Sequence, residues 1–122
     1  MMNQTVLYIG SKMSIVNYMV GYPNLLYHPY VGSKGDVDSF GPLGSVQLLQ
    51  MSTADGVGNT TLISHVKAAN CLPYTNSLGT YDNNLAAGNF DGIDAMTTNG
   101  ISIIQTNYTD ILGPYLKKKG LR

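Results

Sequence analysis

The sequence predicts a β-rich α+β fold: a single antiparallel or mixed sheet, an extended loop or arm in the N-terminal half, and a short C-terminal helix. Two observations favour this class. All seven acidic residues of the 122 are Asp, and Glu, which exposed helix faces commonly use, is missing. The abundant Asp, Asn, Gly, Ser and Thr are typical of turns. The length fits one domain over residues 1–122, with one buried core.

The N-terminal part begins with an expected strand at residues 5–9, Thr-Val-Leu-Tyr-Ile, which Gly10 ends. Residues 11–20 fit either a helix capped by Ser11 or a second strand, and the pattern leaves both open. From 21 to 44, prolines and glycines forbid a long regular element. Because this stretch is rich in aromatic residues, we expect an irregular loop or arm that packs on protein.

Two hairpins are expected further along the chain. Residues 45–53 and 60–67 flank a loop that contains Asp55-Gly56, which is turn chemistry, although both arms also fit short helices. Residues 95–98 and 101–106 are joined by Asn99-Gly100, a dipeptide that suits a type I′ turn because both residues tolerate positive φ.

A short helix is predicted at the C-terminus. Asp110 is placed to cap its start, and Lys117, Lys118 and Lys119 oppose the negative end of its dipole. Gly120 fits the position just past the last helical residue.

Charge and composition exclude several classes of function. Only 11% of the residues are charged, and seven basic residues balance seven acids, so the chain lacks the basic stripe of a dedicated nucleic-acid binder. The longest apolar run, Val6 to Ile9, is far too short to span a membrane, and no secretion signal is recognisable. We therefore expect no membrane contact, and a location in the cytoplasm or in an assembled particle.

No catalytic, cofactor or metal site is predicted. Cys71 and His65 are the only pair that suggests a nucleophile and its base, and no third orienting group accompanies them. Two histidines, one cysteine and no Glu do not make a zinc or calcium site. The glycine-rich stretch from Asp55 to Thr60 lacks the Lys of a phosphate loop.

The prediction of function rests mainly on the tyrosines. Tyr22, Tyr27, Tyr30 and Phe40 lie in the segment rich in Pro and Gly, and we assign them to a protein interface because tyrosine is enriched there. Lys117, Lys118 and Lys119 are candidates for a weak anion or nucleic-acid contact. The expected function is a non-enzymatic, self-associating structural protein, a homo-oligomer such as a viral coat, filament or decoration subunit. The alternative is a small-ligand or nucleotide-binding protein without catalytic residues.

Overall fold

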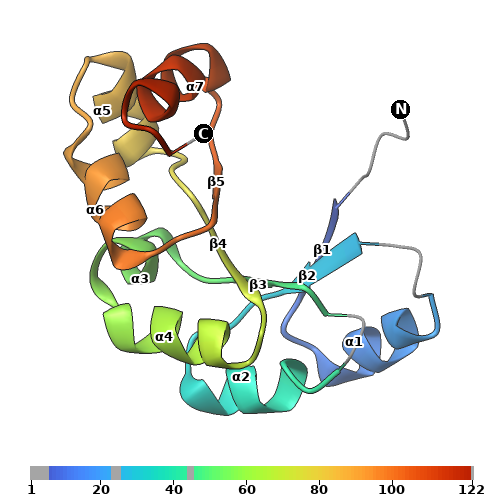
Figure 1. Cartoon of the computed structure of the whole chain (residues 1–122). Coiled ribbons are helices and arrows are strands. Elements are labelled where there is room, and N and C mark those ends of the chain that lie inside the picture. The colour runs from blue at the N-terminus through green and yellow to red at the C-terminus, as the bar shows by residue number, and fades with distance from the viewer. Residues whose placement is uncertain (1–5, 23–25, 44–45, 122) are drawn as a thin grey trace.

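The computed structural model describes residues 6–22, 26–43 and 46–121, in which strands and helices alternate (Figure 1). The strands are β1 (Val6–Gly10), β2 (Leu26–Pro29), β3 (Leu48–Gln50), β4 (Leu72–Asn76) and β5 (Ile103–Gln105). The helices are α1 (Met13–Val20), α2 (Lys34–Phe40), α3 (Thr53–Gly58), α4 (Thr60–Ala68), α5 (Thr80–Ala86), α6 (Asp91–Asn99) and α7 (Thr109–Lys118).

All the pairings between these strands are parallel. β1 pairs with β2, and β3, β4 and β5 pair in that order. Tyr30, just after β2, makes a parallel bridge with Gln50 of β3, and the backbone N–H of Val31 donates to the Gln50 carbonyl at 2.7 Å. The strands therefore form a two-stranded sheet, β1-β2, and a three-stranded sheet, β3-β4-β5, which this isolated bridge joins so that the spatial order follows the sequence from β1 to β5.

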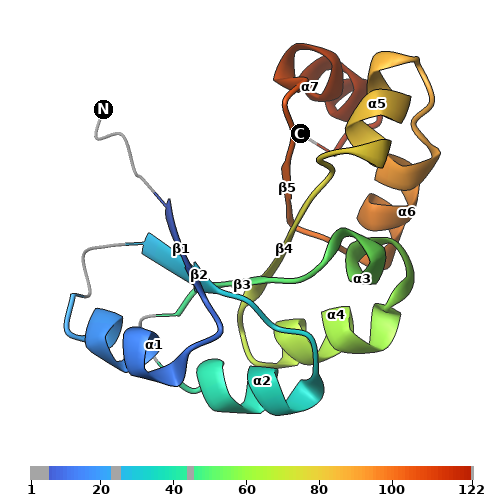
Figure 2. The same cartoon turned by 180° about the vertical axis from the view of Figure 1, so that it is seen from behind.

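The helices form a layer on one side of these strands. Crossovers between parallel strands are right-handed, so a sheet that always adds strands in the same direction carries its helices on one face. Figures 1 and 2 show the helices along the outer side of the bent sheet, with none of the described helices on its inner side. A single apolar core lies between the layers, formed by Tyr27, Leu49 and Met51 of the strand segments and by Val16, Val37, Ile63, Val66 and Met96 of the helices.

The predicted β-rich fold with an antiparallel or mixed sheet is wrong. The described residues form seven helices and only five short strands, all parallel. The reason lies in the helix caps: Ser33 accepts a hydrogen bond from the Asp36 N–H, and Asn59 accepts one from the Leu62 N–H. Many short helices need many caps, and the residues that cap helices are the same ones that favour turns.

The expected hairpin at residues 95–106 is also wrong. α6 continues to Asn99, and Gly100 ends it with φ of +96°, donating its N–H to the carbonyls of Met96 and Thr97. Positive φ at Gly100 was thus correctly expected, but it serves a left-handed helix cap rather than a type I′ turn. β5 then pairs with β4 and not with residues 95–98.

The hairpin over residues 45–67 is wrong as well, and Ser45 lies outside the described residues. β3, α3 and α4 occupy this stretch, so the helical alternative is correct for residues 60–67 only. Gly56 lies inside α3, where a Cβ atom would come within 2.8 Å of Thr75 Cγ2 on β4. The glycine therefore allows close approach of helix and strand rather than a turn.

The extended arm at residues 21–44 is likewise replaced by β2 and α2, with residues 23–25 and 44 outside the described ranges. Residues 11–20 contain helix α1, whose N-cap is Lys12 rather than Ser11. The C-terminal helix is confirmed as α7, with Gly120 at φ of +72° just past its cap. Asp110 does not cap its start: it lies in the first turn, and the N-cap residue is Tyr108. No helix of the described ranges has the length and apolar character needed to cross a membrane.

Candidate functional site

The inner face of the sheet, away from the helices, is the candidate functional site. Partner residues in parallel strands point to the same face, and the register pairs Tyr8 with His28, Gln50 with Tyr74 and Tyr74 with Ile103. Successive residues alternate between the faces, so Leu72 and Gln105 also lie on the inner face. Tyr27, Leu49 and Thr75, on the opposite face, are buried under the helices.

One side chain from each strand joins a continuous row across this inner face. The rings of Tyr8 and His28 lie 5.5 Å apart, and those of His28 and Tyr74 lie 4.7 Å apart in an edge-on arrangement. The side chain of Gln50 hydrogen-bonds to His28, and the Tyr74 hydroxyl donates to Gln105 Oε1 at 2.5 Å. We call these five residues the cross-strand row.

His28 is the unusual member of the cross-strand row. It is only 5% exposed, and its Nδ1 has no hydrogen-bond partner. Burial lowers the pKa of the imidazole below its ordinary value of 6.5, an effect that the hydrogen bond to Gln50 opposes. The ring is therefore neutral at pH 7. A buried polar atom without a partner costs about 1–3 kcal/mol, so Nδ1 is the atom on this face that most needs a ligand.

The inner face is open and uncharged. Tyr8 is 61% exposed and Leu72 is 48% exposed, although both sit on strands. Burial raises the pKa of the Tyr74 phenol, which keeps that side chain neutral as well. Gln50 and Gln105 are the last residues of β3 and β5, so the row reaches the carboxyl ends of the strands. In parallel α/β sheets, ligands bind outside these ends.

Asp82 is a buried carboxylate at the same end of the sheet. Its oxygens accept hydrogen bonds from Ser77 Oγ at 2.5 Å, Thr106 Oγ1 at 2.6 Å and the Asn107 N–H at 2.9 Å. Burial acts to raise the pKa of Asp82, but the three hydrogen bonds together hold it below its usual value. These three hydrogen bonds connect the segment after β4 with the segment after β5. Asp82 therefore has a structural role.

The four aromatic residues predicted as an interface do not share one surface. Tyr27 and Phe40 are buried in the core of this chain. Tyr22 is exposed and shares a hydrogen bond with the Tyr18 hydroxyl at 2.9 Å. Tyr30 is half-buried beside Gln50 and so borders the cross-strand row. Their role in an interface stays a prediction.

The three C-terminal lysines differ in their surroundings. Lys119 Nζ lies 3.0 Å from Asp94 Oδ2, and the Tyr115 hydroxyl donates to Asp94 Oδ1 at 2.6 Å. Lys117 and Lys118 are exposed. A contact of these lysines with an anion or a nucleic acid remains a prediction, and Lys119 already has an acidic partner within the chain.

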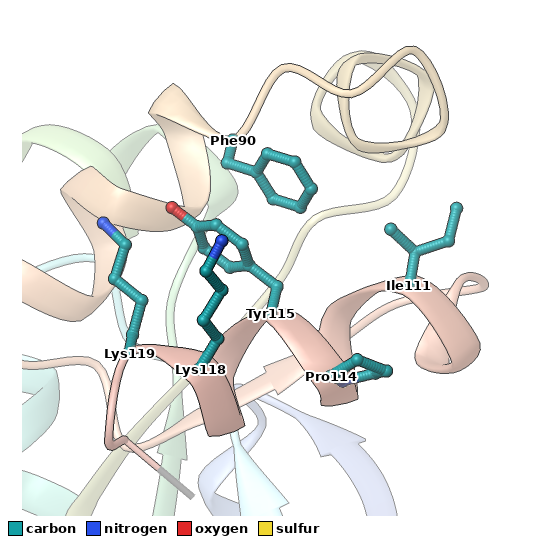
Figure 3. A pocket seen from close by; sticks show the side chains of 6 residues that line it. All are labelled: Phe90, Ile111, Pro114, Tyr115, Lys118 and Lys119. Atoms are coloured by element: carbon teal, nitrogen blue, oxygen red, sulfur yellow. The ribbon is translucent and has the colours of Figure 1, made fainter.

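A hollow of about 560 Å³ lies beside α7 (Figure 3). The rings of Phe90 and Tyr115 stack with centroids 3.9 Å apart within it, and Lys118 and Lys119 lie at its edge. Among the described residues, the one buried side-chain nitrogen or oxygen without a partner is His28 Nδ1, which is elsewhere. The polar groups around the hollow are the ammonium groups of Lys118 and Lys119 and the Tyr115 hydroxyl, which donates to Asp94.

Cys71 is arranged as a packing residue. It is buried, and its thiol donates to the Val46 carbonyl at 3.5 Å rather than to His65. Burial raises the pKa of the thiol, which disfavours the reactive thiolate. Within the described ranges, no group of three or more His, Cys, Asp or Glu side chains is arranged to hold a metal ion.

Sequence reasoning missed the whole cross-strand row. The sequence did contain one signal, the alternation of apolar and polar residues within short strands. His28 follows the buried Tyr27, and Gln50 follows the buried Leu49. The segment around His28 was instead expected to be an irregular loop. No family model matches this chain, and no curated protein or solved structure matches it either.

Proposed function

We propose that the protein is a self-associating β/α subunit that covers its inner sheet face with a second copy of itself. The observation that carries this proposal is the parallel sheet with helices on one face only. Parallel sheets in folded proteins are almost always covered on both faces, because both faces are apolar enough to need burial. The inner face of this chain leaves Tyr8 and Leu72 exposed and lacks a cover among the described residues.

The composition of the inner face favours a second copy as that cover. The cross-strand row and its neighbour Leu72 are uncharged at neutral pH, so two identical faces meet without like-charge repulsion. Most soluble oligomers are two-fold symmetric, and a two-fold axis parallel to the strands would place the β5 edge of one copy beside the β1 edge of the other. Such a pair is closed and does not extend into a filament.

The other parts of the earlier expectation receive less support. β-rich is wrong for this protein, and nothing in the described residues supports a coat, filament or decoration role. Location in the cytoplasm remains a proposal.

Sedimentation velocity of the wild type and two variants tests self-association. We expect a dimer for the wild type and for Ile15→Asp, a control on α1 that is 41% exposed. Leu72→Asp would bury an unpaired charge on the inner face, so its dissociation constant is expected to rise by at least about 100-fold. A wild type that stays monomeric up to about 1 mM would contradict the proposal.

A further inference from the structure

We propose that the hollow beside α7 binds a small aromatic carboxylate, with its ring against Phe90 and Tyr115 and its carboxylate at Lys118 (Figure 3). The proposal goes beyond self-association and does not rest on it. The hollow lies in the helix layer, between α7 and the start of α6, whereas the proposed dimer covers the opposite face of the sheet. Two features meet there: an apolar, aromatic wall and an exposed ammonium group.

The size and lining of the hollow suit a small apolar ligand. Its volume of about 560 Å³ falls within the range of about 300–1,000 Å³ that is usual for ligand pockets. Phe90, Ile111, Pro114 and Tyr115 provide the apolar wall, and Lys118 and Lys119 bring the charge. Ligand sites commonly combine a mostly apolar lining with a few polar groups that orient the ligand.

The wall is held in place by contacts within the chain. The rings of Phe90 and Tyr115 stack with their centroids 3.9 Å apart and their planes 14° apart. The Tyr115 hydroxyl donates to Asp94 Oδ1 at 2.6 Å, which links α7 to α6. Because these side chains are already ordered, little of their conformational entropy is lost on binding. Aromatic rings pack favourably offset or edge-on to one another, so the wall favours a ring over a flexible chain.

The charges around the hollow select one negative group. Lys119 Nζ lies 3.0 Å from Asp94 Oδ2. Hydrogen bonds from Tyr115 and from Lys119 lower the pKa of Asp94, so its carboxylate is ionised and balances Lys119. Lys118 is exposed and forms no ion pair within the described ranges, which leaves one uncompensated positive charge at the edge of the hollow. A ligand whose ring fills the hollow can place a single carboxylate at that ammonium group.

Binding of indole-3-propionate to the whole chain at neutral pH tests the site. The chain contains no tryptophan, so the indole emission comes from the probe alone. Indole-3-propionamide is the neutral counterpart of nearly the same shape, and we expect it to bind about 5-fold more weakly because it lacks the charge. Tryptamine, which joins the same ring to a positive charge, should bind more weakly than either.

Substitutions separate the role of the charge from that of the ring. Lys118→Gln should weaken indole-3-propionate binding by about 5-fold and leave binding of the amide unchanged. Lys117→Gln removes the same charge from a side chain that does not line the hollow, and it should bind as the wild type does. Phe90→Ala should weaken both probes by about 10-fold or more, whereas Tyr18→Ala, on α1 and 66% exposed, should weaken neither. Circular dichroism verifies that each variant is folded, and the exposed Lys118 keeps the test available if Phe90→Ala does not fold.

Four results would overturn the proposal. One is no binding of indole-3-propionate up to about 10 mM. Another is equal affinity of the wild type and folded Lys118→Gln for this probe. The third is tighter binding of a short peptide that ends in phenylalanine, which would assign the hollow to a protein partner. The last is loss of self-association in folded Phe90→Ala, which would assign the hollow to a second copy, whereas Leu72→Asp tests the proposed dimer separately.

Discussion

His28 makes the stability of the protein depend on pH at the scale of one residue. Burial lowers its pKa below 6.5, so as the pH falls the unfolded chain takes up a proton before the folded chain does. The contribution of the neutral ring to stability is full above about pH 6.5 and is lost as the pH falls toward the folded-state pKa. The free energy of unfolding should therefore decrease as the solution is acidified through this range.

Urea denaturation between about pH 7.5 and about pH 5.5 measures this dependence. His28→Gln is expected to flatten the slope, whereas His65→Gln, which keeps His28, should preserve it. An unchanged slope in folded His28→Gln would show that other groups cause the dependence.

Single residues also show where sequence reasoning succeeded and where it stopped. Positive φ at Gly100 and Gly120 was expected from the sequence and is present. At Gly100 the element that uses this conformation could not be predicted, because the left-handed cap of a helix and a type I′ turn require the same backbone freedom. The orphaned Nδ1 of His28 could not be predicted either, since it depends on neighbours from other strands.

At the scale of elements, the packing of α3 on β4 depends on Gly56. An added Cβ would meet Thr75 Cγ2 at 2.8 Å and Thr75 Cβ at 3.1 Å, and Thr75 is fully buried. Gly56→Ala therefore forces the helix and strand apart. We expect it to lower the free energy of unfolding by about 1–3 kcal/mol.

Gly58, in the same helix, provides the control. Beyond the adjacent residues and the backbone of α3 itself, no atom lies within 4 Å of the Cβ that Gly58→Ala would add. This variant should leave the stability unchanged or raise it by up to about 1 kcal/mol, because alanine restricts the unfolded chain. Chemical denaturation compares the two variants, and equal stability would refute the close approach of α3 to β4.

Elements with their own local pattern were the ones that the sequence revealed. β1 and α7 were expected, and α1 and α4 were among the alternatives. β3 and β5 lie within the strand arms expected at residues 45–53 and 101–106, although both arms were assigned to hairpins. β2 was missed because it has four residues, too few to show a period. The parallel pairing of these strands depends on residues far apart in the chain, and no short motif reports it.

At the scale of the whole molecule, the absence of charge on the inner face predicts how the proposed dimer responds to salt. Ion pairs weaken as salt screens them, whereas burial of uncharged surface does not. We therefore expect the dissociation constant to change by less than about 3-fold between about 0.05 and 0.5 M NaCl. Sedimentation equilibrium measures it, and weakening by more than about 10-fold would indicate that charged groups such as Lys117 and Lys118 hold the copies together instead.

The candidate site belongs to this scale as well, which is why the sequence did not disclose it. Each strand contributes one side chain to the cross-strand row, from Tyr8 near the start to Gln105 near the end. Composition did indicate that the chain has few charged side chains. It did not indicate which residues gather there, because that requires the strand order.

The sequential strand order has a consequence for how the molecule is made. Within each sheet a strand pairs with its neighbour in the sequence, and the Tyr30–Gln50 bridge joins the two sheets at consecutive strands, so each new strand finds its partner already synthesised. Chains leave the ribosome N-terminus first, and closing short loops between neighbours costs little entropy. The sheet is thus suited to growth by one strand and helix at a time during translation, with its last edge completed only when β5 emerges.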